Sequence, residues 1–344
     1  MRASHINPQG RSKPLPLASD QVQQTSTYDL TLESNPAAFL FHTAIWANQN
    51  DNRYADGLLG YEGIVYDDIF SLLWDSPTAR FLIKFAASKN WRVTIEPLDD
   101  AAYDLDDEQK ILVLNNYNLK LPTFEKNGYF RHALVLALVK GLRDIWHIES
   151  RQPYEHGLTL ESVLLLERIR AADCDVIALL TAWELRGEGI PEIWRHILGA
   201  PEGDMAMRFT CAVEQQPGRL FNGTALIEAF YGWFNNESCV SACDQQTLDM
   251  IDMNLDMARQ TKLYGKKKPS TEFVEKLSYL PDKSCYLKNY GYEIINNAQF
   301  TGLRDDVSRT YYSQIKRELE TVTIGAVAFR DPKLAAKIFP EELA

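Results

Sequence analysis

Three polar residues in the otherwise apolar stretch at 128–149 are the first candidates for chemistry. Lys140, Asp144 and His147 are spaced at i, i+4 and i+7, so on a helix they lie on one face. Because a buried charge is costly unless it is paired, Lys140 and Asp144 must either border a cavity or form ion pairs. Glu149 follows nine residues after Lys140 and points to the opposite side of the helix.

A metal site is one alternative for this group. Asp144 and His147 have i, i+3 spacing, and Glu167 and Asp173 from the next long segment could complete a carboxylate-rich set. Such a set suits a hard or borderline divalent ion such as zinc. Lys140 beside these donors argues against a bound cation. A polar stripe that faces water is the other alternative.

Motifs of several other enzyme classes are absent from the sequence. It contains no G-x-S-x-G nucleophile elbow, no G-x-x-x-x-G-K-[ST] phosphate loop and no G-x-G-x-x-G dinucleotide motif. Cys174 is a poor candidate nucleophile, because the flanking Asp173 and Asp175 would raise the pKa of its thiol. No catalytic residue can therefore be named from these motifs.

The composition narrows the function classes further. The net charge of −11 on 344 residues argues against general nucleic-acid binding, which needs an excess of Lys and Arg. The five cysteines have irregular spacing, which favours reduced thiols over a disulfide framework. No apolar run is long enough to span a membrane, and we see no secretory signal. We expect a cytoplasmic protein that binds neither nucleic acid nor membrane.

The sequence pattern predicts an α+β fold that is mainly helical, and the elements of this fold position the candidate residues. Residues 1–30 are poor in large apolar side chains and predict a disordered tail before a single domain at 31–344. Residues 91–97 and 110–115 predict two short strands, separated by an acidic turn around 104–108. They form a small strand element, at about 91–115, beside a large helical body.

The helices are predicted from apolar spacing and end signals. A Ser76-Pro77 break divides one predicted helix, and Thr159 is the expected N-cap of another. Pro191 is expected in the first turn of a short helix. The predicted helices cover residues 36–47, 66–90, 128–149, 160–186, 191–198, 204–215, 224–235, 240–260, 271–279 and 303–320.

The order of two strands, a central helix and a second long helix resembles that of zincin-type zinc peptidases. More specifically, the chain resembles a bacterial family of metallopeptidases of unknown function, with HELRHAWQ on the first helix and EADA on the second. Residues 140–147 read KGLRDIWH and residues 171–174 read AADC at these places. Residues 182–186 (AWELR) and 225–234 (ALIEAFYGWF) extend the similarity. The resemblance implies a zincin-like core at about 90–200 and a helical C-terminal subdomain at about 200–344.

The same resemblance implies a degenerate metal site. Lys140 and Asp144 stand at the two histidine positions, Gly141 at the general-base position and Ala171 at the third-ligand position. Arg143 fits the family pattern. A catalytic zinc needs three donors and an open coordination position, and these residue types do not supply them.

We hypothesise that the ammonium of Lys140 replaces the positive charge of the metal and pairs with Asp144, and with Asp173 or Glu167. The chain is then a pseudo-zincin without cofactor that acts by binding a protein partner or is a structural relative of the peptidases. The alternative is a metal-dependent hydrolase with one divalent ion, such as zinc, at Asp144, His147, Glu167 and Asp173. A small-molecule sensor that uses the same cleft is a third hypothesis.

Overall fold

The computed structural model describes residues 28–29, 68–99, 101–120, 126–150, 157–261, 263–324, 327–330 and 332–339. The predicted helix at 36–47 lies outside these ranges. So does the predicted tail at 1–30, except for Tyr28–Asp29, which form strand β1. The mainly helical α+β class is confirmed, whereas the zincin-like core and the subdomain boundaries stay predictions.

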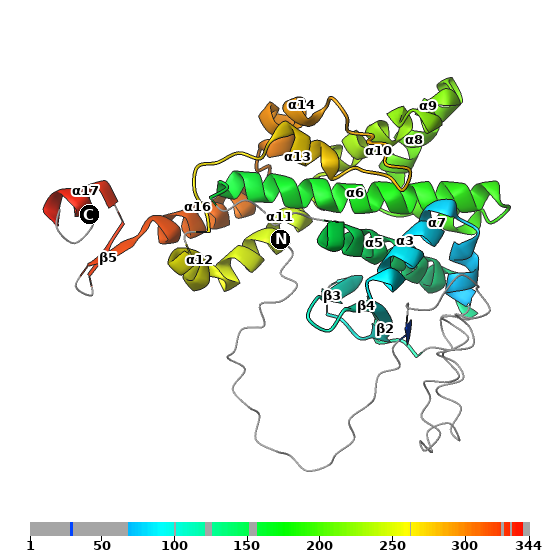
Figure 1. Ribbon diagram of the computed structural model, residues 1–344, viewed down its shortest axis with the longest axis horizontal. Helices are drawn as coiled ribbons and strands as arrows, with labels where there is room; N and C mark the ends of the chain where they lie inside the picture. Colours follow the sequence, from blue (N-terminus) through cyan, green and yellow to red (C-terminus); the bar gives the residue numbers. More distant parts are fainter. Residues whose placement is uncertain are drawn as a thin grey trace, which may run out of the picture.

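A small mixed sheet lies beside the helical body (Figure 1). Its strands are β1 (Tyr28–Asp29), β2 (Arg92–Glu96), β3 (Tyr103–Asp106) and β4 (Ile111–Asn115), in the order β1-β2-β4-β3. β2 and β4 are parallel, and β3 is antiparallel to β4. The strands at 91–97 and 110–115 are thus confirmed.

The acidic turn predicted around 104–108 was wrong for its first half. This segment is strand β3, in which Tyr103 and Leu105 are buried while Asp104 is exposed. The alternation directs the apolar side chains to the core and the acidic ones outward, as in a half-buried strand. The turn follows the strand, at residues 107–110.

The predicted break at Ser76-Pro77 is confirmed. A helix at 68–74 ends there, and α3 (Pro77–Ser88) begins, with the Ser76 hydroxyl accepting a hydrogen bond from the backbone N–H of Ala79. Glu184 also binds this helix start: its carboxylate accepts hydrogen bonds from the Ser76 hydroxyl and from the Thr78 N–H and hydroxyl, the last two at 3.0 and 2.7 Å. A negative charge is favourable at a helix N-terminus.

Two long helices form the centre of the molecule. α5 (Gly128–Ser150) lies between the sheet and α6 (Leu160–Gly187), which runs along most of the body (Figure 1). Thr159 caps α6, as predicted, by accepting a hydrogen bond from the Ser162 N–H at 3.1 Å. Both helices are buried on most sides, which explains why their apolar residues show no single clear stripe.

Further helices pack around α6 or follow it along the chain. They are α7 (Glu192–Leu198), α8 (Gly203–Gln215), α9 (Gly218–Phe221), α10 (Thr224–Asn235), α11 (Glu237–Met253), α12 (Leu255–Thr261), α13 (Thr271–Lys276), α14 (Gly291–Asn296), α15 (Ala298–Thr301), α16 (Asp306–Glu320) and α17 (Pro332–Ile338). Strands β5 (Val322–Ile324) and β6 (Val327–Phe329) form a hairpin that was not predicted. The predicted helix at 240–260 is divided at Asn254, which caps α11.

A buried ion pair attaches the C-terminal helices to α6. Arg168 donates from Nε and Nη2 to the two carboxylate oxygens of Asp244 in α11, at 2.6 and 2.7 Å. Its Nη1 donates to the carbonyl of Phe300 in α15 at 2.6 Å. Figure 1 shows α16 extending past the end of α6, followed by the hairpin and α17. None of the helices in the described ranges is both long and apolar enough for a bilayer span.

Candidate functional site

Lys140 does not pair with Asp144, so the pairing in our hypothesis was wrong. Its Nζ lies 2.6 Å from Asp175 Oδ1 and 2.8 Å from Glu202 Oε1. Asp144 is instead neutralised by Arg170 from α6, which leaves the flexible lysine stem free to reach the other two carboxylates. Burial alone would lower the pKa of Lys140, but the charges of Asp175 and Glu202 outweigh burial and raise it. Lys140 is therefore a paired ammonium on α5, with its side chain 21% exposed.

Asp144 lies in the protein interior, between α5, α6 and the sheet. Its carboxylate forms an ion pair with Arg170 Nε and accepts a hydrogen bond from the Tyr103 hydroxyl at 3.3 Å. Cys174 Sγ lies 4.0 Å from the same carboxylate. Burial, together with the charges of Asp144 and Asp173, raises the pKa of the Cys174 thiol well above its ordinary value. The thiol is therefore protonated near neutral pH, which agrees with the prediction that Cys174 is a poor nucleophile.

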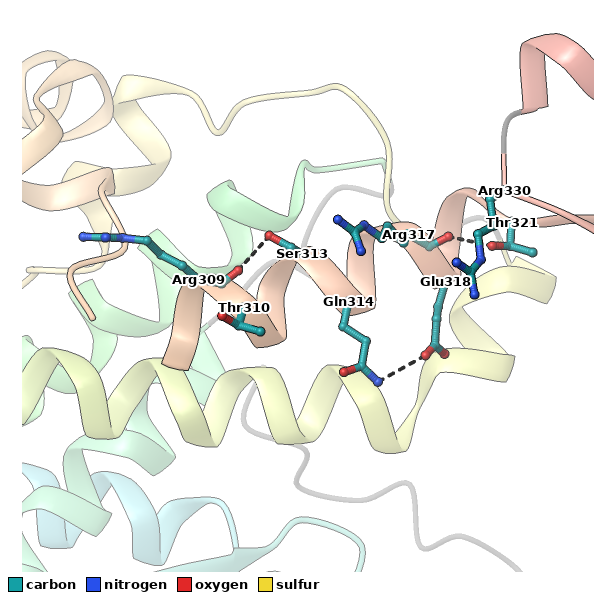
Figure 2. A pocket seen from close by; sticks show the side chains of 8 residues that line it. All are labelled: Arg309, Thr310, Ser313, Gln314, Arg317, Glu318, Thr321 and Arg330. Atoms are coloured by element: carbon teal, nitrogen blue, oxygen red, sulfur yellow. Dashed lines mark hydrogen bonds between the residues drawn. The ribbon is translucent and has the colours of Figure 1, made fainter. Parts of the chain in front are cut away.

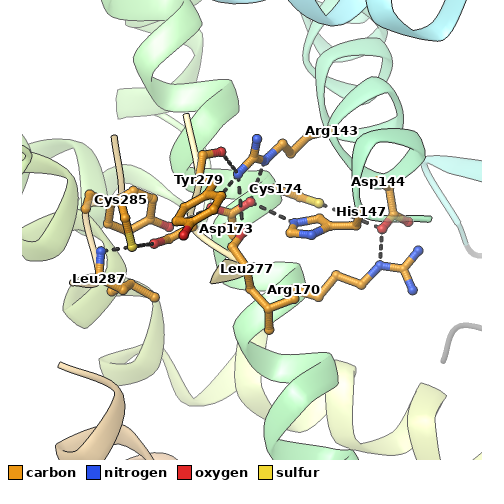
Figure 3. A network of polar contacts seen from close by, with 12 residues as sticks. Arg143, Asp144, His147, Arg170, Asp173, Cys174, Leu277, Tyr279, Cys285 and Leu287 are labelled. Atoms are coloured by element: carbon orange, nitrogen blue, oxygen red, sulfur yellow. Dashed lines mark hydrogen bonds and ion pairs between the residues drawn. The ribbon is translucent and has the colours of Figure 1, made fainter. Parts of the chain in front are cut away.

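Asp173 is the acceptor at the centre of the network in Figure 3. Arg143 donates to it from Nε at 2.6 Å and from Nη2 at 3.2 Å. Tyr286 donates its hydroxyl hydrogen at 2.8 Å, and His147 Nε2 lies 2.8 Å from Oδ2. Burial would raise the pKa of Asp173, but Arg143 and His147 hold it below its ordinary value. This carboxylate is therefore ionised and fully saturated with donors.

Arg143 connects α5 to α6 and to residues 277–279, the segment that follows α13. Besides its ion pair with Asp173, its Nη2 donates to the carbonyls of Leu277 and Tyr279, at 3.3 and 2.8 Å. Its guanidinium also lies 4.0 Å from the ring centroid of Trp146. A planar fork with several donors suits this combination of carboxylate, carbonyl and aromatic contacts, which a lysine would not reproduce.

His147 is neutral in the folded protein. Burial lowers the pKa of its imidazole to about 4, because the nearby Arg143 and Arg170 add to the effect and Asp173 only partly opposes it. With Nε2 facing an ionised carboxylate, the neutral ring carries its hydrogen on Nε2 and donates it to Asp173. The imidazole is thus a hydrogen-bond donor inside the network.

The four donors of the alternative metal site lie close together but are bound by arginines. Asp173 pairs with Arg143, and Asp144 with Arg170, whose Nη1 also lies 3.7 Å from Glu167 Oε2. Two guanidinium cations among the donors oppose the approach of a divalent cation. Within the described part of the chain, no group of three or more His, Cys, Asp or Glu residues could hold a metal ion. These residues do not fit a metal centre.

Gly141, which the resemblance sets at the general-base position, packs against the sheet. Gly141 is buried on α5 against β4, and a Cβ atom at this position would lie 2.5 Å from Leu112 Cδ1 and 2.9 Å from Cδ2. A larger side chain would therefore force the side chain of Leu112 to move. Ala171, at the third-ligand position, is partly buried and packs against the hydrophobic core.

The comparison with known families concerns the part of the chain that contains these residues. Residues 127–287 match the model of a family described as "Putative metallopeptidase family (DUF6782)". The match confirms the predicted resemblance and extends from the start of α5 to just beyond Tyr286. Over these residues the chain is metallopeptidase-like. No curated protein and no solved structure matches the chain.

The ion pair between Arg143 and Asp173 joins two positions that fit the metallopeptidase family pattern, the R of HELRH and the D of EADA. Sequence reasoning named both residues but missed three partners in the network: Arg170, Tyr103 and Tyr286. Arg170 gave a usable signal, because a charge in a helix that is apolar on most sides must find a buried partner. The two tyrosines gave none, since they are far from α5 and α6 in the sequence.

Proposed function

We propose that this metallopeptidase-like chain has no peptidase activity and acts by binding another protein. The observation that carries the proposal is the contact between Gly141 and Leu112, because the expected position of the general base has no side chain and Leu112 would have to move to admit one. HExxH chemistry requires a carboxylate there to accept a proton from the metal-bound water.

The charges at the two histidine positions support the same conclusion. Lys140 brings an ammonium where the family has a neutral imidazole, and it is held there by Asp175 and Glu202. Asp144 brings a carboxylate, but Arg170 neutralises it. Both charged residues at the expected ligand positions, Lys140 and Asp144, are thus paired with other side chains of the protein. Neither is left to bind a metal ion or a substrate.

A binding role is supported by the contacts that join the interior helices to the rest of the fold. The interior contacts fix α5 and α6 against the sheet and the segment around Tyr279, which gives a rigid body. A rigid scaffold holds surface loops and helices in fixed positions, which lowers the entropy cost of binding a partner. Partner recognition is therefore expected on the outer helices.

Metal analysis combined with a hydrolysis assay tests the proposal. The purified protein is incubated with Zn²⁺ or Mn²⁺, dialysed, and analysed for bound metal, and its activity is measured on a mixture of fluorogenic peptides. We expect no stoichiometric metal and no hydrolysis. Retention of about one ion per chain, together with hydrolysis that is lost in Asp144→Asn, would refute the proposal.

A further inference from the structure

A groove on the outer part of the molecule is distinct from the network between α5 and α6. It encloses about 620 Å³ between α16 and the residue that follows β6 (Figure 2). It is lined by Arg309, Thr310, Ser313, Gln314, Arg317, Glu318, Thr321 and Arg330. Three of the eight lining residues are arginines and only one is acidic, so the groove attracts anions.

The charge of this groove contrasts with that of the whole chain. Residues 309–330 contain four Lys or Arg and two Asp or Glu residues, whereas the chain carries a net charge of −11. Arg317 and Arg330 are exposed, and no ion pair joins either of them to another of the described residues. Arg309 pairs with Asp306 at 2.8 Å at the other end of the groove. Two guanidinium groups are thus available to a ligand.

The arrangement of the arginines indicates the shape of that ligand. Arg309, Ser313 and Arg317 follow one another at intervals of four residues along α16, and Figure 2 shows Arg330 beside Thr321 at the far end. A rise of 1.5 Å per residue places Arg309 and Arg317 about 12 Å apart along the helix, which three to four residues of an extended chain would span.

We propose that this groove binds an extended acidic segment of a partner polypeptide, with Arg317 and Arg330 pairing with its carboxylates. The hydroxyls of Thr310 and Ser313 donate to the carbonyls of Asp306 and Arg309, at 2.8 and 2.7 Å, so their oxygens can accept hydrogen bonds from the backbone N–H groups of such a segment. The inference stands apart from the proposed loss of catalysis, because it uses no residue of α5 or α6.

The test measures binding of a fluorescein-labelled octaglutamate peptide to the full chain by fluorescence anisotropy at low and at physiological salt. The variant is Arg317→Glu with Arg330→Glu. The control is Arg195→Glu with Lys288→Glu, which makes the same change in net charge at two exposed positions outside the groove. We expect the groove variant to weaken binding about tenfold or more and the control less than about twofold. Unchanged thermal unfolding of both variants shows that they fold.

Several outcomes would overturn the inference. Equal weakening by both variants would mean that the peptide senses only net charge, and absence of binding would mean that no such site exists. Tighter binding of oligothymidylate or inorganic polyphosphate than of octaglutamate would assign the groove to phosphates. Self-association that is lost in the groove variant, without peptide binding, would assign it to a second copy of the chain. None of these outcomes depends on metal content or hydrolysis.

Discussion

Arginine has opposite roles in two regions of this protein. Between α5 and α6, Arg143 is 1% exposed and has its carboxylate partner, Asp173, at 2.6 Å. On α16, Arg317 is exposed and forms no ion pair with other described residues. The comparison teaches that the interior charges are used to hold the fold together, whereas those of the groove are available for recognition. The following predictions test that division by measuring stability at each place.

The largest loss of stability is expected for Asp173→Asn. The substitution keeps the shape of the side chain but leaves the guanidinium of Arg143 buried without a counter-charge, which should cost about 3–5 kcal/mol of unfolding free energy. Urea unfolding followed by circular dichroism measures the change. Asp175→Asn is the matched control, because Asp175 is 14% exposed and Lys140 keeps Glu202 as a second partner. Equal losses of unfolding free energy in both variants would mean that the buried pair does not stabilise the fold more than the half-buried pair.

A pH dependence is expected from His147. The unfolded chain protonates this imidazole near pH 6.5 and the folded chain near pH 4, so the unfolded state binds the proton first as pH falls. Stability from this group is therefore complete above about pH 6.5 and is lost progressively toward pH 4, by up to about 3 kcal/mol. His147→Gln keeps a donor for Asp173 but cannot titrate, so its unfolding free energy should vary less over this range. Parallel profiles for the variant and the wild type would contradict the assignment.

Gly141→Ala tests the contact between helix and sheet. Because the new methyl group would overlap Leu112, the expected cost is about 1–3 kcal/mol. Leu112→Ala in the same chain should relieve part of it, so the double variant should be more stable than the sum of the single effects predicts. Strict additivity of the two substitutions would show that the two residues do not compete for the same space.

Lys140→Met is expected to have an intermediate effect. Removing the ammonium leaves the carboxylates of Asp175 and Glu202 without their cation, but both retain some access to water. The expected loss is about 1–2 kcal/mol, smaller than for Asp173→Asn, and is read from the same urea unfolding. Unchanged stability would mean that Lys140 is an ordinary solvated side chain.

The smallest change in stability belongs to the groove. Arg317→Glu with Arg330→Glu alters two exposed side chains and should shift the unfolding free energy by less than about 0.5 kcal/mol. Chemical denaturation of this variant beside Asp173→Asn completes the comparison. A loss of several kcal/mol in the groove variant would show that these arginines also hold the fold together.

Much of the fold could be predicted from sequence, because local signals are strong in helices and their ends. The Ser76-Pro77 break, the Thr159 cap and the apolar stretches of α5 and α6 gave nearly correct boundaries. Strand β3 was missed because the acidic residues at 104 and 106 are typical of a turn. The signal for a strand is the alternation of these residues with the buried Tyr103 and Leu105.

The partners within the candidate site were harder to predict. Helical spacing correctly places Lys140 and Asp144 on one face, but it does not give the direction in which a long lysine stem leaves that face. The hydrogen bond from Tyr286 to Asp173 joins residues 113 positions apart. No periodicity in one sequence contains that information, since it depends on how the α13 to α14 segment folds over α6.

The buried pair of Arg168 and Asp244 has a consequence for where this protein can be divided. The family match ends at residue 287, yet the guanidinium of Arg168 also needs the carbonyl of Phe300. A fragment that stops at the family boundary would enclose a cation with one of its N–H groups unsatisfied. The segment that matches the family model is thus shorter than the segment that satisfies this buried cation, so the family boundary is a poor place to divide the protein.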